Sequence, residues 1–124
     1  MTPASAPGPF VPRRVEKPWG HEVVWADAPA YVGKVLVVRE GHALSLQYHE
    51  RKDETLHLLR GRVKFWVGES PDGLREVSLK EGDSIRLEAG TLHRLEAVTD
   101  VEMLEASTPE LEDVVRVEDR YGRI

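Results

Sequence analysis

The hydrophobic pattern of the chain has a period of two residues. Apolar and polar residues alternate over 44–49, as in a strand with one buried face, and Val35–Val38 is an apolar run between glycines, as in a buried strand. Similar runs predict strands at 56–59, 63–67, 76–79, 84–87, 92–96 and 101–106. Strands rather than helices therefore dominate the predicted structure.

Glycine-containing turns separate the predicted strands. Arg60–Gly61–Arg62 predicts a tight hairpin turn, because glycine adopts a positive φ without steric cost. Short, evenly spaced strands joined by such turns are typical of sandwiches and barrels. We therefore expect an all-β fold, either a sandwich or a barrel. Near the C-terminus, Thr108–Glu110 favours a short helical turn, and 111–117 allows either an edge strand or an irregular ending.

Length, composition and charge narrow the class of protein. A chain of 124 residues fits one domain, and the four prolines in Met1–Pro12 lead us to expect an arm over 1–14 and a folded domain over 15–124. Because the chain has no cysteine, nothing indicates an oxidising compartment, and we expect a cytoplasmic protein. A net charge of −5 argues against nucleic-acid binding. No secretion signal is recognisable, and no apolar run approaches the roughly 20 residues of a membrane span.

Candidate metal ligands stand out against the apolar strands. Gln47 and His49 are two residues apart and point to the same face of their strand. Glu54 opens the next strand, and His93 lies in a later one. Two imidazoles, a carboxylate and an amide oxygen suit one divalent transition metal ion (Zn, Mn, Co, Ni or Fe), with two coordination positions left for water or substrate.

The spacing of these residues resembles two motifs of the cupin family. The first motif corresponds to Gly41, Gln47, His49, Glu54 and Gly61, with glutamine in the place of the usual first histidine. The second corresponds to Gly82, Glu88–Gly90 and His93, with Glu88 where proline is usual and Ala97 where asparagine is usual. The resemblance implies a single small antiparallel β-barrel of the jelly-roll kind, with the metal near the barrel mouth.

Within the cupins, the chain resembles the cupin domain of type II mannose-6-phosphate isomerases. The stretches that carry this resemblance are 17–20, 44–47, 90–96 and 115–123. In that family a histidine-rich stretch with an arginine usually precedes the metal glutamate, whereas Glu50–Asp53 stands there in this chain. A nucleotidyltransferase domain also often precedes the cupin domain in those enzymes.

Three further residues are candidates for catalysis. Glu105 shares a strand face with Val101 and Met103, which makes it a candidate general base, with a salt-bridged role at the rim as the alternative. Lys52 and Arg94 lie close in sequence to the expected ligands. Their cationic groups are candidates for binding phosphate or carboxylate.

The expected function is metal-dependent aldose–ketose isomerisation of a sugar or sugar phosphate, similar to that of mannose-6-phosphate isomerase. The metal would act as a Lewis acid while a base moves a proton between adjacent carbons. Two alternatives remain: a non-catalytic sugar-binding module, and another cupin metalloenzyme such as an oxygenase or lyase. We expect a small-molecule substrate, no nucleic-acid or membrane partner, and a homodimer that covers exposed sheet edges.

Overall fold

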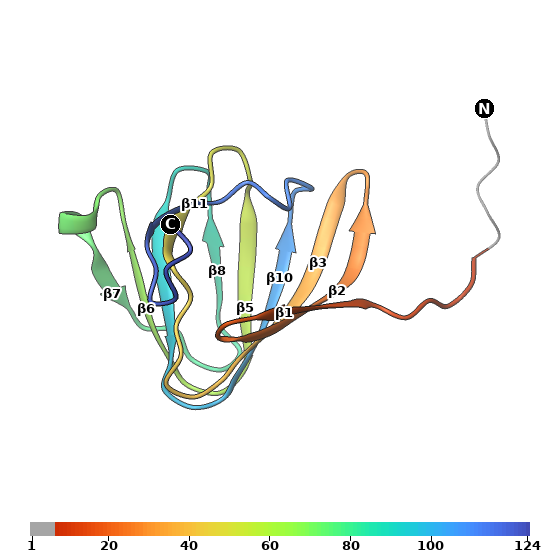
Figure 1. Ribbon diagram of the computed structural model, residues 1–124, viewed down its shortest axis with the longest axis horizontal. Helices are drawn as coiled ribbons and strands as arrows, with labels where there is room; N and C mark the ends of the chain where they lie inside the picture. The colour runs from red at the N-terminus through yellow and green to blue at the C-terminus, as the bar shows by residue number, and fades with distance from the viewer. Residues whose placement is uncertain (1–6) are drawn as a thin grey trace.

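The computed structural model describes residues 7–124 and contains two antiparallel β-sheets (Figure 1). The first sheet has the strand order β1-β2-β3-β10-β5-β8, and the second has the order β11-β4-β9-β6-β7. The strands are β1 (Arg13–Lys17), β2 (Gly20–Ala28), β3 (Tyr31–Val38), β4 (Leu46–Tyr48), β5 (Glu54–Arg60), β6 (Val63–Gly68), β7 (Arg75–Val77), β8 (Ser84–Leu87), β9 (Leu92–Ala97), β10 (Val101–Ser107) and β11 (Val115–Glu118). A single 3-10 turn, η1 (Pro71–Gly73), accompanies them in this part of the chain.

The all-β class expected from the sequence is confirmed, while the closure into a single barrel stays a prediction. Each strand predicted from the hydrophobic pattern overlaps an observed one, and β8 matches 84–87 to the residue. The C-terminal segment forms an edge strand, β11, rather than an irregular ending, and no helical turn forms at 108–110.

The predicted hairpin around Gly61 is wrong, although the turn itself is present. Gly61 has a φ of 103°. However, β5 pairs with β10 and β8, whereas β6 pairs with β9 and β7, so the turn carries the chain from one sheet to the other. The chain also changes sheets at each of the other connections from β3 to β11 except the one between β6 and β7. Residues distant in sequence thereby face one another across the interior.

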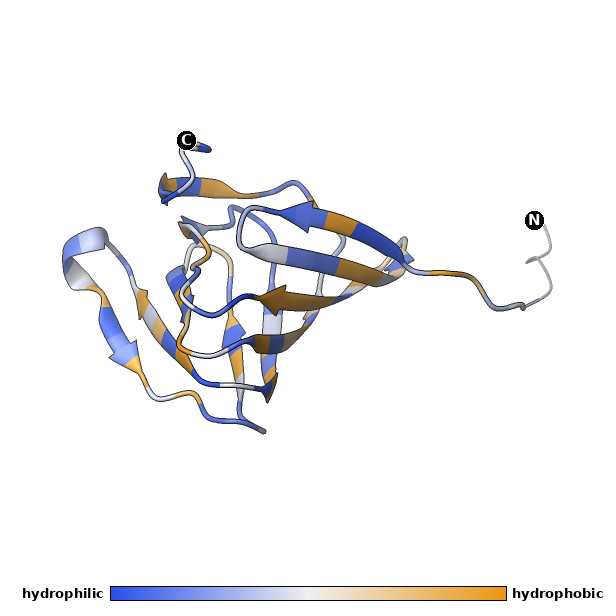
Figure 2. Cartoon of the chain, turned by 60° about the horizontal axis from the view of Figure 1, so that its bottom comes forward, coloured by the Kyte–Doolittle hydropathy of each residue, from blue (hydrophilic) through white to orange (hydrophobic). Residues whose placement is uncertain are grey.

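The hydrophobic core lies between the two sheets. In Figure 2, apolar and polar residues alternate along the strands, as expected when one face of each sheet is buried. Leu58, Phe65 and Met103, which come from both sheets, are fully buried. Apolar burial of this kind stabilises the fold by roughly 1.5–3 kcal/mol per large side chain.

The N-terminal hairpin of β1 and β2 was not predicted, because charged residues obscure its alternation. Its strands carry ion pairs such as Arg14–Glu16 and Arg13–Asp27. The expected boundary between an arm over 1–14 and a domain over 15–124 stays a prediction: residues 1–6 lie outside the described residues, 7–12 carry no strand, and β1 begins at Arg13. Among residues 7–124, no helix is long and apolar enough to span a membrane.

Candidate metal centre

The inner face of the six-stranded sheet changes from apolar to polar along its strands. On β10, Met103 lies between Leu36 and Leu58, but two residues later Glu105 lies between Lys34 and Leu56. Ser107, two residues further, pairs with Glu54. All of these side chains are buried. One end of the interior is therefore hydrophobic, and the other collects charged groups.

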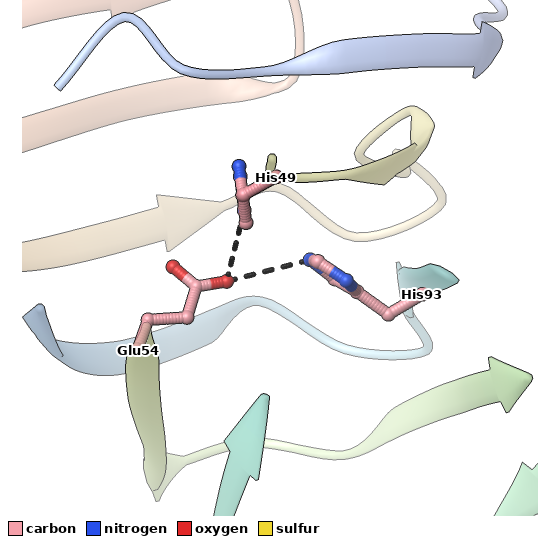
Figure 3. Close-up of side chains that lie close together, drawn as sticks. All are labelled: His49, Glu54 and His93. Carbon is pink, nitrogen blue, oxygen red and sulfur yellow. Dashed lines mark hydrogen bonds and ion pairs between the residues drawn. The ribbon is translucent and has the colours of Figure 1, made fainter. Parts of the chain in front are cut away.

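Two histidines and a glutamate converge at this polar end (Figure 3). His49 follows β4, Glu54 begins β5 and His93 lies on β9, so both sheets contribute. Oε1 of Glu54 lies 3.2 Å from Nε2 of His49 and 3.4 Å from Nε2 of His93. One ligand atom from each residue lies within 4.8 Å of the others, and each residue is only 4% exposed.

The second nitrogen of each imidazole fixes the proton arrangement. Nδ1 of His49 lies 2.5 Å from the carbonyl oxygen of Asp113, and Nδ1 of His93 lies 2.9 Å from that of Thr91. Because a carbonyl oxygen only accepts hydrogen bonds, each Nδ1 must carry the proton and donate it. In the neutral rings, both Nε2 lone pairs then point toward the Glu54 carboxylate, where they need either extra protons or a cation between them.

This donor set fits a divalent transition metal ion. Two imidazole nitrogens and one carboxylate oxygen are a common combination for such ions, and hydrogen bonds from the distal ring nitrogens to carbonyl groups are typical of metal-binding histidines. His49, Glu54 and His93 would hold the ion. The geometry thus brings together three of the four residues for which the sequence predicts metal binding.

Gln47, the fourth predicted ligand, lines the same cavity. It is the direct cross-strand partner of His93, so the two side chains share one face of the sheet. Its Oε1 accepts a hydrogen bond of 2.6 Å from Ser45 Oγ. Gln47 is therefore adjacent to the His–Glu cluster, while its carbonyl oxygen is engaged by Ser45.

Lys52 and Glu105 also lie at the site. The Lys52 ammonium is 3.1 Å from Glu54 Oε2 and 3.0 Å from Glu105 Oε2, and Ser107 Oγ donates a hydrogen bond of 3.1 Å to the same oxygen of Glu105. Lys52 thus bridges the two carboxylates and is itself 5% exposed. Glu105 is thus buried and salt-bridged, and its role as a general base stays a prediction.

Burial and charge shift the pKa values of these three groups in different directions. Burial, followed by the Glu54 charge, raises the pKa of Glu105, and Lys52 opposes this shift only in part. Burial would also raise the pKa of Glu54, but hydrogen bonds from His49 and His93, which form when these rings carry a second proton, and the Lys52 charge outweigh it and lower that pKa. Burial works to lower the pKa of Lys52, but attraction to Glu105 and Glu54 raises it.

Arg94, in contrast, lies away from the cluster. Its guanidinium stacks over the Trp66 ring at 4.9 Å from the centroid and lies 3.7 Å from a carboxylate oxygen of Glu118. Neighbouring residues on a strand point to opposite faces, so with His93 directed inward Arg94 points outward.

Asp113 holds the loop that carries Lys52. The sequence did not indicate this role of Asp113. Its carboxylate accepts hydrogen bonds from the backbone N–H groups of Glu50, Arg51 and Lys52 at 3.0, 2.7 and 2.9 Å. These hydrogen bonds lower the pKa of Asp113 to about 2, and those from Glu50 and Arg51 contribute most. The segment before β11 therefore positions both His49, through the Asp113 carbonyl group, and Lys52.

The cluster opens into a cavity of about 330 Å³. This volume is at the small end of the range for ligand pockets, roughly 300–1,000 Å³. Lys34, 3.2 Å from Glu22, lines the cavity beyond Glu105, and Lys17 lies 3.7 Å from the same glutamate. The sequence analysis did not identify Lys34 as a site residue. Its position between Val32 and Leu36 on one face of β3 could have indicated that it is buried.

Comparisons with known proteins agree with the fold and the motif spacing. Residues 34–106 match the cupin domain family. The chain is 33% identical over 119 residues to mannose-1-phosphate guanylyltransferase of Escherichia coli K12, a match that covers 92% of this chain and 24% of that protein. The chain therefore spans about a quarter of that relative's length.

Two solved structures have the same fold. The capsular polysaccharide assembling protein CapF of Staphylococcus aureus matches with a TM-score of 0.72 and 14% identity, over 90% of this chain and 33% of that one. Bacillus subtilis oxalate decarboxylase, a protein with Mn(II) centres, matches with a TM-score of 0.72 and 18% identity, over 87% of this chain and 30% of that one. Since the family match covers more than half of the chain, the protein belongs to the cupin family.

Proposed function

We propose that this chain is a metal-dependent isomerase of a sugar phosphate, interconverting an aldose and a ketose as mannose-6-phosphate isomerase does. One observation carries the proposal: the lone pairs of His49, Glu54 and His93 converge beside the buried Lys52–Glu105 pair. The relative named mannose-1-phosphate guanylyltransferase supports a phosphorylated mannose as the substrate class. Gln47 completes the proposed ligand set from the cavity wall. The homodimer and the cytoplasmic location stay predictions.

In this proposal, Glu105 and Lys52 handle the proton and the charge. A carboxylate whose pKa is raised is a stronger base than an ordinary carboxylate and can accept and return a proton. Glu105 would take the proton from C2 of the aldose and return it to C1, while the hydroxyl proton moves from O2 to O1, so that product and substrate have the same composition. The Lys52 ammonium would face the negative charge that develops on the substrate oxygens. A bound divalent ion supplies Lewis-acid stabilisation of that charge.

A second candidate function is a sugar-binding module without catalysis. The position of Glu105 favours it, because the oxygen nearest to Lys52 also accepts a hydrogen bond from Ser107. This ion pair and hydrogen bond hold the carboxylate in place, as expected for a structural role. The module would use the same cavity and the same metal ligands.

Metal analysis combined with isotope exchange tests the proposal. The purified protein should contain about one divalent ion per chain, and His93→Ala should lose it. His57→Ala is the matched control, because His57 lies on the opposite face of β5 from Glu54 and its Nδ1 is 2.8 Å from Ser84 Oγ. Metal-loaded protein should exchange the C2 proton of mannose 6-phosphate for deuterium in heavy water. Bound metal without exchange would refute the isomerase and leave the binding module.

A further inference from the structure

Arg116 is a cavity-lining arginine with an unsatisfied buried nitrogen. It lies on β11 and contributes to the wall of the cavity that contains the His–Glu cluster. Its Nε is fully buried and has no hydrogen-bond partner. Because Arg116 also lines the cavity, its guanidinium group is available to an anionic ligand there.

The other cationic groups of this cavity already have acidic partners. Lys52 pairs with Glu54 and Glu105, and Lys17 and Lys34 both lie near Glu22. Arg123 forms two hydrogen bonds with the Asp119 carboxylate, at 2.8 and 2.9 Å. Among the cavity-lining lysines and arginines of residues 7–124, Arg116 alone forms no ion pair with a carboxylate. An anion from outside the chain would therefore find its strongest uncompensated charge at Arg116.

Strand register connects Arg116 to the metal cluster. Arg116 is the cross-strand partner of Gln47, and Gln47 is the partner of His93. Directly paired residues in antiparallel strands lie on the same face, about 4.5–5.5 Å apart between Cα atoms. The three residues therefore form one row that faces the cavity, with Arg116 and His93 separated by about 10 Å along it. This separation lets one small ligand contact both ends.

We infer that Arg116 binds the phosphate monoester of the substrate, while the reacting oxygens of the sugar lie at the His–Glu cluster. The inference rests on the proposed function, because it takes the same cavity as the substrate site. The planar guanidinium fork of arginine matches two phosphate oxygens at once, and such charge-assisted pairs are about twice as strong as neutral hydrogen bonds. The site accordingly selects phosphorylated sugars over neutral ones.

Ligand binding by the metal-loaded full chain, measured by isothermal titration calorimetry, tests this inference. The probes are mannose 6-phosphate, mannose and glucuronate. Wild type should bind mannose 6-phosphate at least tenfold more tightly than the other two. Arg116→Gln should weaken mannose 6-phosphate binding about 10- to 100-fold and leave mannose binding unchanged. Arg116→Lys should give an intermediate loss, because it keeps the charge without the fork.

Arg75→Gln is the matched control. Arg75 lies on β7, the opposite edge strand of the same sheet, and does not line this cavity. Its substitution should leave all three affinities unchanged. Melting temperature and metal content, measured for each variant, separate a lost contact from a lost fold.

The outcomes also separate this inference from the isomerase proposal. Arg116-dependent binding of mannose 6-phosphate without deuterium exchange supports the phosphate site and refutes only the isomerase. Undiminished binding by folded, metal-loaded Arg116→Gln overturns the inference, even if exchange is observed. A wild-type preference for glucuronate, or no preference among the probes, overturns it as well.

Discussion

The buried ammonium group of Lys52 holds two carboxylates in place, and its removal should be costly. Lys52→Met keeps an unbranched side chain of similar length but removes the charge. Glu54 and Glu105, whose side chains are 3% and 5% exposed, then lose the cation that lies 3.1 and 3.0 Å from their oxygens. Removing one partner of a buried ion pair destabilises a protein by about 3–5 kcal/mol.

The lower end of this range applies here, because His49 and His93 remain beside Glu54. For a chain of 124 residues, an unfolding entropy of about 2.1 cal/mol/K per residue gives about 0.26 kcal/mol/K in total. A loss of about 3 kcal/mol therefore lowers Tm by about 11 °C.

Urea denaturation followed by tryptophan fluorescence, with a chelator present, measures the loss. Lys52→Met/Glu105→Gln should recover at least half of it, because the second substitution removes one of the orphaned charges. The coupling energy between the two sites should then be about 1.5 kcal/mol or more. Added Zn²⁺ or Mn²⁺ should stabilise Lys52→Met more than wild type, since a cation at Glu54 replaces the lost charge. A difference of about 0.5 kcal/mol or less in the free energy of unfolding is typical of a surface substitution. If metal-free Lys52→Met differs from wild type by no more than this, the ion-pair reasoning is refuted.

Two further predictions concern the fold outside the site. Gly61→Ala places a Cβ at a positive φ and against the carbonyl oxygen of Asp100. Urea denaturation should therefore show a loss in the free energy of unfolding that exceeds the roughly 1–3 kcal/mol of backbone strain alone. Gly82→Ala, with a φ of 90° and open space around the new Cβ, is the control and should lose less. Arg123 lowers the pKa of Asp119 to about 2, so the stability from this ion pair is present above the unfolded pKa and is lost as pH falls toward 2. Asp119→Asn should therefore lower Tm by a constant amount above about pH 5 and by almost nothing near pH 2, and a loss that does not depend on pH would contradict this explanation.

The His–Glu cluster could be predicted because its members carry a strong local signal. Gln47 and His49 place polar side chains on one face of their strand, and Glu54 and His93 each lie at the beginning of a strand. Period-two alternation says which residues share a face of one strand. It does not say which faces meet, and the resemblance to the cupin motifs supplied that information.

Arg116 and Lys34 were not predicted, each for a different reason. Arg116 alternates with Val115 and Val117, so a buried face for the valines would have turned it outward; the register with Gln47 turns it inward. Lys34 was lost with the strand boundary, since the predicted strand began at Val35 and the observed one begins at Tyr31. The hairpin predicted at Gly61 was wrong because a glycine determines the local φ but does not determine which sheet the next strand joins.

The pairing of charges in the cavity leaves the His–Glu cluster and Arg116 with opposite requirements. Lys52 compensates Glu54 and Glu105, and Glu22 compensates Lys34, so these groups need no ligand. The lone pairs at the His–Glu cluster require a cation, and the guanidinium of Arg116 requires an anion. Either ligand alone satisfies one end only, whereas a divalent ion together with a phosphorylated sugar satisfies both. Metal and mannose 6-phosphate should for this reason bind with positive cooperativity, each raising the affinity for the other by the same factor.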